Sequence, residues 1–177
     1  MTVDELVRHI AASPQHQHLY HFTDEANFAG INAHGILSKS QLRAKGLWPP
    51  TATGGNELSQ RLDLERGIDP YVSLCMTRNH GMKFLAQQAG RLPKPHYLGI
   101  NPAVLATPGV RVALGVANAN DVLILPIAEA IAHMDIEVLY SRTDWTDAAI
   151  QTRLRAAEKF EVLVPTLVPR AMIMVRY

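Results

Sequence analysis

The sequence predicts an α+β protein built from short helices and short strands. Segments with alternating apolar residues and segments with apolar residues at helical spacing follow one another, without an internal repeat. The chain has 177 residues, about the length of one ordinary domain, so we expect a single domain over residues 1–177. A hydrophobic fraction of 47% and a charged fraction of 19% are typical of a globular chain with its own core.

The first predicted elements are a helix, a strand and a second helix. Leu6 and Ile10 are spaced for the buried face of a short opening helix. Residues 18–22, with the sequence HLYHF, are aromatic and alternate as in a strand. Asp24 begins a stretch with acidic residues in its first turn, and the stretch ends at Gly35, a residue suited to a left-handed C-cap. This stretch is therefore expected to be a helix.

A loop separates these elements from the remaining strands and helices. Residues 48–57 contain two prolines and two glycines, which exclude a continuous helix or strand and predict a mobile surface loop. Residues 144–160 are expected to form a helix, because apolar residues recur at helical spacing after a capping Thr143 or Asp144. A strand is expected at 161–164, closed by Pro165. The other predicted elements are strands at 71–76, 96–100, 111–114 and 172–175 and a helix at 82–88.

Composition excludes several classes of protein. Seventeen Lys and Arg residues against sixteen Asp and Glu residues leave a net charge of +1, so any nucleic-acid contact must be local. Cys75 is the only cysteine, which excludes an intrachain disulfide and a cysteine-based zinc cluster and fits a reducing cytoplasm. Charged residues interrupt the N-terminal segment where a signal peptide needs an apolar run, and the apolar stretch 122–132 is too short to cross a membrane. We therefore expect a cytoplasmic protein with no membrane partner.

Three possible chemistries find little support in the residues. His16 and His18 lie close together, but no carboxylate follows at ligand spacing, so we expect no metal. Cys75 lies in an apolar strand without an adjacent base, which is typical of a buried structural cysteine. Gly54 and Gly55 are not followed by the Lys-Ser/Thr of a phosphate-binding loop.

Glu161 and His21 are the residues for which a purely structural role is hardest to accept. Glu161 begins a strand that reads as buried, where a carboxylate is costly unless it is paired or lies at the exposed end of the strand. It either faces water, pairs with Arg155 or Lys159, or serves a ligand. His21 is either a satisfied core histidine or a donor presented beside Thr23 toward a ligand.

Four landmarks follow one another in a characteristic order. They are Tyr20-His21-Phe22-Thr23 with Asn27 and Gly35-Ile36-Leu37-Ser38, then Arg61 ahead of Tyr71-Val72, then Asn118-Ala119, and finally Glu161-Val-Leu-Val-Pro165. In this order and spacing the chain resembles the DarT-type ADP-ribosyltransferases, which attach ADP-ribose from NAD to bases of single-stranded DNA. The resemblance covers residues 19–175, nearly the whole chain.

The resemblance implies an ADP-ribosyltransferase fold, which is a split β-sheet with flanking short helices that holds NAD, the co-substrate, in its cleft without a metal. It assigns catalysis to Glu161 and Arg61. Glu161 would stabilise the positive charge that develops on the ribose and take a proton from the attacking base, while Arg61 would pair with the NAD phosphates. The residues that it assigns to NAD binding are His21, Phe22, Thr23, Asn27, Gly30, Ser38 and Tyr71.

The resemblance also bears on the acceptor, the molecule that receives ADP-ribose. For this part it rests on a substrate-recognition loop, here about 118–161, and on local cations and aromatic rings. His80 and Arg155 are additional candidates for contacts with the nucleic acid. The residues predicted to contact nucleic acid are Arg78, Asn118, Trp145 and Arg153. The resemblance also implies a toxin or phage-defence role with a neutralising antitoxin partner.

Three departures from the family pattern adjoin the acceptor site. Ser73-Leu74-Cys75 stands in place of a proline and aromatics, Lys159 in place of a glutamine, and Gly81 in place of the proline before a methionine. RNA or protein therefore stays open as an alternative acceptor to single-stranded DNA. A non-catalytic NAD-binding module, in which Glu161 is structural, is a further alternative.

Overall fold

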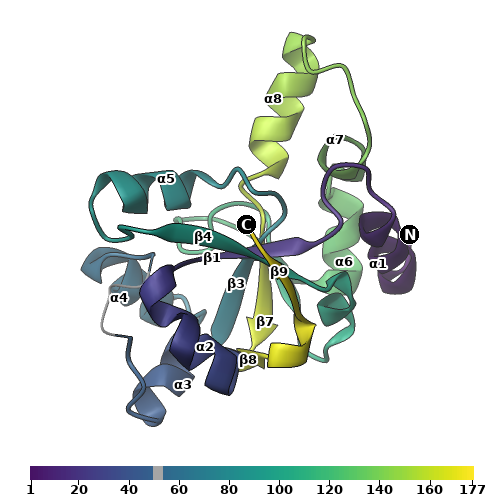
Figure 1. The fold of residues 1–177 in the computed structure, drawn as a ribbon. Coiled ribbons are helices and arrows are strands. Elements are labelled where there is room, and N and C mark those ends of the chain that lie inside the picture. The colour runs from purple at the N-terminus through teal and green to yellow at the C-terminus, as the bar shows by residue number, and fades with distance from the viewer. Residues whose placement is uncertain (50–53) are drawn as a thin grey trace.

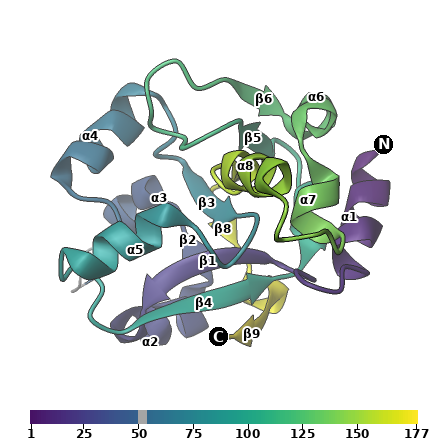
Figure 2. The same cartoon turned by 90° about the horizontal axis from the view of Figure 1, so that it is seen from above.

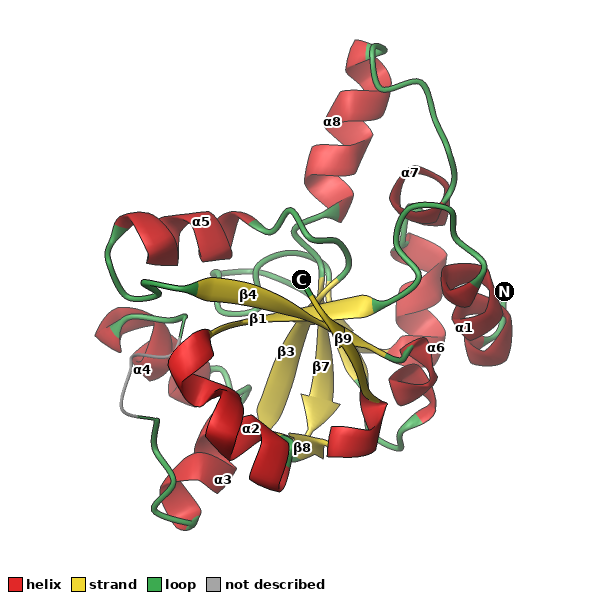
Figure 3. Cartoon of the chain, in the orientation of Figure 1, coloured by secondary structure: helices red, strands yellow, loops and turns green. Residues whose placement is uncertain are grey.

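The computed structural model describes residues 1–49 and 54–177. Its strands form a seven-stranded sheet in the order β6-β5-β7-β3-β1-β4-β9 and a separate two-stranded sheet, β2-β8. Figures 1 and 3 show the central strands β3 and β7 crossed by β1, β4 and β9. Neighbouring strands in both sheets are antiparallel. The strands are β1 Leu19–Asp24, β2 Ile36–Leu37, β3 Tyr71–Cys75, β4 Pro95–Ile100, β5 Arg111–Ala113, β6 Ile124–Pro126, β7 Glu161–Pro165, β8 Leu167–Val168 and β9 Ile173–Arg176.

The large sheet is split in its middle. Strands β1 and β4 are paired along their whole length, and so are β3 and β7. Between β1 and β3, however, Tyr20↔Cys75 is the one paired position. The strands of the two halves diverge from this point, so that the sheet consists of β6-β5-β7-β3 on one side and β1-β4-β9 on the other. The predicted α+β class and the split sheet are both confirmed.

Short helices surround the two halves. The α-helices are α1 Val3–Ala11, α2 Phe28–His34, α3 Lys39–Ala44, α4 Glu57–Glu65, α5 Gly81–Gln88, α6 Ile127–Ala130, α7 Ile136–Tyr140 and α8 Ala148–Ala157. Single 3-10 turns lie at Glu25–Asn27, Pro102–Ala106, Ile131–His133 and Arg170–Met172. Seen from above, α3, α4 and α5 lie on one side of the central strands and α1, α6 and α7 on the other (Figure 2). Helix α8 projects from the body of the molecule (Figure 1).

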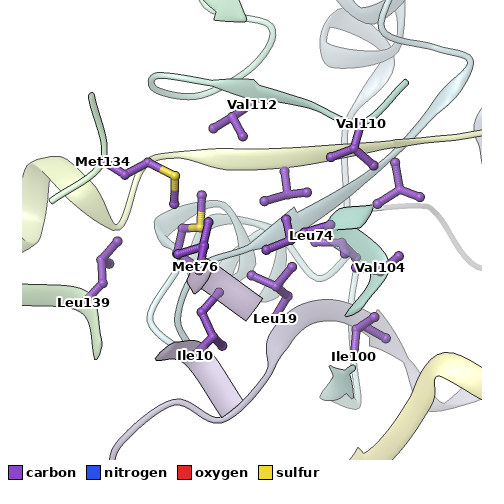
Figure 4. Packing of buried hydrophobic residues seen from close by; sticks show 14 of the residues in the cluster. Ile10, Leu19, Leu74, Met76, Ile100, Val104, Val110, Val112, Met134 and Leu139 are labelled. Atoms are coloured by element: carbon purple, nitrogen blue, oxygen red, sulfur yellow. The ribbon is translucent and has the colours of Figure 1, made fainter. Parts of the chain in front are cut away.

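The main core lies on one face of the central strands, and period-2 alternation explains which residues enter it. Val72 and Leu74 of β3 and Val162 and Val164 of β7 are buried there. They pack with residues from many other elements, among them Ile10, Leu19, Ile100 and Leu139 (Figure 4). The intervening residues of the same two strands, which include Ser73, Cys75 and Glu161, point to the opposite face. The register places Cys75 directly opposite Glu161 on that face.

Local chemistry accounts for several helix boundaries. Helix α1 begins with a capping box, in which Thr2 and Glu5 each accept a hydrogen bond from the backbone of the other, at 3.2 and 2.7 Å. Asp24 accepts a hydrogen bond from Ala26 N at 3.0 Å and so caps the turn that leads into α2. Gly35 ends α2 with a φ of 74°, where a Cβ would lie 2.4 Å from the Val168 carbonyl oxygen.

Two predicted segments differ from the structure. The late helix was expected from residue 144, but α8 begins at Ala148, because Asp147 caps it through Ala149 N at 2.7 Å. Trp145 therefore lies in the preceding turn and not on the helix. Within the predicted loop at 48–57, residues 50–53 lie outside the described residues, and Glu57 already begins α4. Among the described residues, no helix is long and apolar enough to span a membrane.

Candidate active site

A cavity of about 490 Å³ opens where the two halves of the sheet diverge. We call it the central cavity. His21, Phe22 and Thr23 of β1 line it from one half, and Glu161 of β7 lines it from the other. Many of the other lining residues come from α2, the β2 to α3 region, α4, β3, the start of α5 and residues 116–118, and the loop residues 46–49 and 54–55 line it as well. A pocket of this size is within the range of small-molecule and cofactor sites.

Glu161 is buried in this cavity, only 9% exposed. Its Oε1 accepts a hydrogen bond from Ala117 N at 3.3 Å, and His80 Nε2 lies 3.7 Å from the same oxygen. Burial raises the pKa of Glu161 to about 7, an effect that the Ala117 N–H and the Ser73 side chain partly offset. A carboxyl group that titrates near neutrality can act as a base or as a stabilising charge.

His21 lies on β1, near the point where the sheet splits. It belongs to the half-sheet opposite to the one that contains Glu161. Its Nδ1 lies 3.2 Å from the Ser73 carbonyl oxygen, so the imidazole bridges β1 and β3 beyond their single backbone pair. Partial burial lowers the pKa of His21, and the Ser73 carbonyl opposes that shift. At neutral pH the ring is therefore an uncharged group with one N–H donor.

A chain of polar side chains closes another wall of the cavity. Asp63 of α4 forms an ion pair with Lys39 of α3 and accepts a hydrogen bond from Asn118 Nδ2 at 3.1 Å. Asp63 is buried, so its charge requires partners of this kind. On the β1 side, Asn27 Nδ2 donates to Thr23 Oγ1 at 3.1 Å.

The structure brings most of the predicted ligand-binding residues to one cavity. Phe22 also contacts Gly54, where a Cβ would lie 2.5 Å from the phenyl ring. The predicted site residues that line the cavity are His21, Phe22, Thr23, Asn27, Gly30, Ser38, Tyr71, Asn118 and Glu161.

Four predicted residues do not line the cavity. Arg61 lies on α4 with its side chain 68% exposed and its Nε 3.7 Å from Glu65. Arg153 of α8 is paired with Asp135 and Glu137, each at 2.7 Å. Trp145 is exposed in the turn before α8. The guanidinium of Arg78 lies over the Tyr177 ring, 4.2 Å from its centroid.

Sequence reasoning missed three residues of the site or gave them another role. Lys39 and Asp63 carry no local signal, because their pairing joins two helices that are far apart in sequence. His80 was expected to be a cation near the acceptor, but it is 5% exposed and burial lowers its pKa, so it is an uncharged residue inside the cavity. Cys75 is buried, as its apolar strand predicted, and burial together with Glu161 raises the pKa of its thiol.

Comparison with known proteins identifies the family. The model of the family described as ssDNA thymidine ADP-ribosyltransferase, DarT, matches residues 20–175. This chain belongs to that family. No curated protein sequence matches it.

Solved structures of the same family share the fold. Thermosipho africanus DarTG in complex with ADP-ribose superposes with a TM-score of 0.69 at 18% identity, over 90% of this chain and 43% of that chain. Thermus sp. 2.9 DarT in complex with ADP-ribosylated ssDNA has a TM-score of 0.63, and in complex with NAD+ it has 0.60. Both Thermus matches have 18% identity and cover 88% of this chain and 78% of the Thermus chain. The chain thus spans less than half the length of the Thermosipho protein.

Proposed function

We propose that this chain is one cytoplasmic domain of DarT type that transfers ADP-ribose from NAD to a nucleobase in single-stranded DNA and releases nicotinamide. One observation carries the proposal. Glu161 and His21, which come from opposite halves of the split sheet, line the same cavity. Family membership supports the reaction class, and the complexes of Thermus DarT with NAD+ and with ADP-ribosylated ssDNA support NAD and single-stranded DNA as the two substrates.

The chemistry requires a carboxylate at the sugar. When the bond from the ribose C1′ to nicotinamide breaks, its electron pair leaves with nicotinamide and positive charge develops on the ribose. Ionised Glu161 would stabilise that charge. The same carboxylate would then take the proton of the attacking base nitrogen as the new bond to C1′ forms, a role that typically accelerates a reaction about 10² to 10⁴-fold.

The remaining predicted roles complete the proposal. NAD would contact His21, Thr23, Asn27 and neighbouring residues of the central cavity, with no metal. Arg61 would act as the catalytic arginine, which requires the exposed side chain to reach the cavity when substrates bind. The nucleic-acid strand would contact Arg78, Asn118, Trp145 and Arg153.

A transfer assay tests the proposal. Purified protein is incubated with NAD labelled in its adenylate moiety and with single-stranded oligonucleotides that contain all four bases. We expect labelled oligonucleotide from the wild type and none from Glu161→Ala. Equal labelling by both proteins would contradict the proposal. The family description makes a thymidine-containing strand the first acceptor to test.

The same assay separates the alternatives. In a labelled lysate, a product destroyed by DNase supports a DNA acceptor, whereas one destroyed only by RNase or protease indicates an RNA or protein acceptor. NAD binding in calorimetry without nicotinamide release would indicate a non-catalytic module.

A neutralising antitoxin is the expected protein partner, by analogy with the Thermosipho match, which is a DarTG protein. Expression of the wild type should then arrest growth of a bacterial host, and Glu161→Ala should not. A harmless wild type that transfers ADP-ribose in the test tube would contradict the toxin role alone.

A further inference from the structure

His80 is a buried titratable residue that the proposed reaction leaves without a role. It occupies the N-cap position of α5 without a side-chain capping hydrogen bond, and its backbone N–H donates to Tyr97 Oη at 3.2 Å. Its ring is stacked on Phe22, with 6.2 Å between ring centroids and 24° between ring planes. The imidazole is therefore held in place by the backbone on one side and by an aromatic ring on the other.

The imidazole of His80 interacts with the Lys159 backbone but has no hydrogen bond of normal geometry. Neither ring nitrogen meets hydrogen-bond geometry with any of the described residues. Its Nε2 lies 3.7 Å from Glu161 Oε1, just beyond hydrogen-bond length. Buried polar atoms without a partner are rare and call for an explanation, and here the nearest charged oxygen belongs to the proposed catalytic residue.

The electrostatic setting decides which of the two groups carries a proton. Burial lowers the pKa of His80, and the Lys159 backbone only partly opposes this, so the ring is neutral and keeps one N–H. Glu161 has its pKa raised to about 7 and is ionised in part of the molecules at neutral pH. An imidazole N–H that approaches by a few tenths of an ångström would donate a charge-assisted hydrogen bond to the ionised form, which is stronger than the one to the protonated form.

We propose that His80 is a positioning residue for Glu161, whose Nε2–H donates a hydrogen bond to Oε1 and holds the carboxylate ionised and oriented in the central cavity. The assignment rests on the proposed function, since it gives Glu161 its catalytic form. When Glu161 takes the proton of the attacking base, the acceptor charge disappears and the hydrogen bond weakens. Glu161 then returns its proton to solvent, and His80 restores the ionised state.

Other groups around the pair enter the pH dependence. Glu161 faces the Ala117 N–H, the Ser73 side chain, Asp63, Lys39 and the thiol of Cys75. His80 faces Glu161, the Tyr97 hydroxyl, the Phe22 ring and the Lys159 backbone. All of these groups are retained in variants of residue 80. A change in the titration of Glu161 between such variants therefore reports on the imidazole.

The first experiment measures the titration of Glu161 directly. The protein is labelled with ¹³C in the glutamate carboxyl groups, and the Glu161 signal is identified by its loss in Glu161→Gln. We expect His80→Leu to raise the pKa of Glu161 by about one unit, the effect of removing one hydrogen bond to a charged group. His80→Gln places an amide N–H near the position of Nε2 and should restore the wild-type titration, whereas the shorter His80→Asn should not.

A matched control and a kinetic measurement complete the test. His133 is exposed and does not line the cavity, so His133→Leu should leave the Glu161 titration unchanged. In the transfer assay, the pH of half-maximal kcat should move upward with the pKa in His80→Leu and return to the wild-type value in His80→Gln.

The outcomes separate the two proposals. An unaltered Glu161 titration in His80→Leu would overturn the role of His80 and leave the transfer function standing. A wild type that transfers nothing would overturn the proposed function, and the positioning role with it. If His80→Leu does not fold, the comparison of His80→Gln with His80→Asn decides, because equal titrations in these two variants would also overturn the proposal.

Discussion

Asp63 accepts a hydrogen bond from Asn118 at 3.1 Å, although the two residues are 55 positions apart in sequence. The second carboxylate oxygen of Asp63 is paired with Lys39. One buried carboxylate thus joins α3, α4 and the segment after β5 at the wall of the central cavity. This arrangement makes Asp63 a structural support of the site, and its removal affects three elements at once.

We expect Asp63→Ala to lower the free energy of unfolding by about 1–3 kcal/mol, because it leaves Lys39 and Asn118 without their shared partner. NAD affinity should fall as well, since both residues line the cavity. Urea denaturation and calorimetry measure the two effects. Glu65→Ala is the matched control, because this carboxylate lies on the same helix and is 60% exposed. Equal free energies of unfolding of Asp63→Ala and Glu65→Ala would show that the contacts of Asp63 do not stabilise the fold.

We expect ionised Glu161 to lower the free energy of unfolding at high pH. Its pKa in the folded state is about 7, above the value of 4.5 for an unperturbed glutamate, so folding favours the protonated form. The associated stability is fully present below pH 4.5 and is lost as the pH rises through 7. Glu161→Gln, which cannot ionise, should therefore gain on the order of 3 kcal/mol relative to the wild type between pH 4 and pH 9. Urea titrations at both pH values test this, and a constant difference would contradict it.

The sequence predicted the strands of the large sheet better than the small elements around them. Strands β1, β3, β4 and β7 were predicted within a residue or two, because alternation and apolar runs identify buried strands. Strands β2, β6 and β8 have only two or three residues and carry no periodic signal. Helix α8 begins later than predicted because Asp147 caps it. Thr143 and Asp144 are equally suitable capping residues by sequence, so the sequence alone does not select Asp147.

The candidate site was predicted in part for a similar reason. His21 and Glu161 stand out locally, as polar residues in apolar strands, and both line the cavity. Lys39 and Asp63 depend on tertiary contacts that no local pattern contains. His80 was interpreted as a local contact for the acceptor strand, since no neighbouring residue in the sequence indicates that it packs against Phe22 and Tyr97.

Gly54→Ala should weaken NAD binding. A Cβ at this position would lie 2.5 Å from Cε2 of Phe22, and so the ring would have to move within the cavity that it lines. We expect the KM for NAD to rise about tenfold, the equivalent of a moderate overpacking cost. Gly81→Ala is the control, because a Cβ there meets no atom within 4 Å. An unchanged KM in Gly54→Ala would show that Phe22 does not contact NAD.

Arg61→Ala separates a catalytic arginine from a structural one. The side chain is 68% exposed and its contact with Glu65 is a surface ion pair, so the free energy of unfolding should change by less than about 0.5 kcal/mol. We expect transfer to be lost nonetheless. Full transfer by a folded Arg61→Ala protein would remove this residue from the mechanism, and a sharply lowered Tm would make it structural.

Arg78 and Arg153 should differ in their contribution to binding of single-stranded DNA. The guanidinium of Arg153 is already held by Asp135 and Glu137, whereas Arg78 stacks on Tyr177 and has no ion pair within the described part of the chain. Arg78→Ala should therefore weaken binding more strongly than Arg153→Ala and reduce its salt dependence. Fluorescence anisotropy with a labelled oligonucleotide measures both, and equal losses would contradict the ranking.

The single backbone pair between β1 and β3 has a consequence for local motion. Amide groups of β1 and β3 that face the gap have no backbone partner across it among the described residues, so their hydrogens should exchange with deuterated solvent faster than those between β3 and β7. A dinucleotide that contacts residues of both strands would restrain the motion of the two half-sheets relative to each other. Slower exchange on both sides upon addition of NAD would then register binding even in a variant that performs no chemistry.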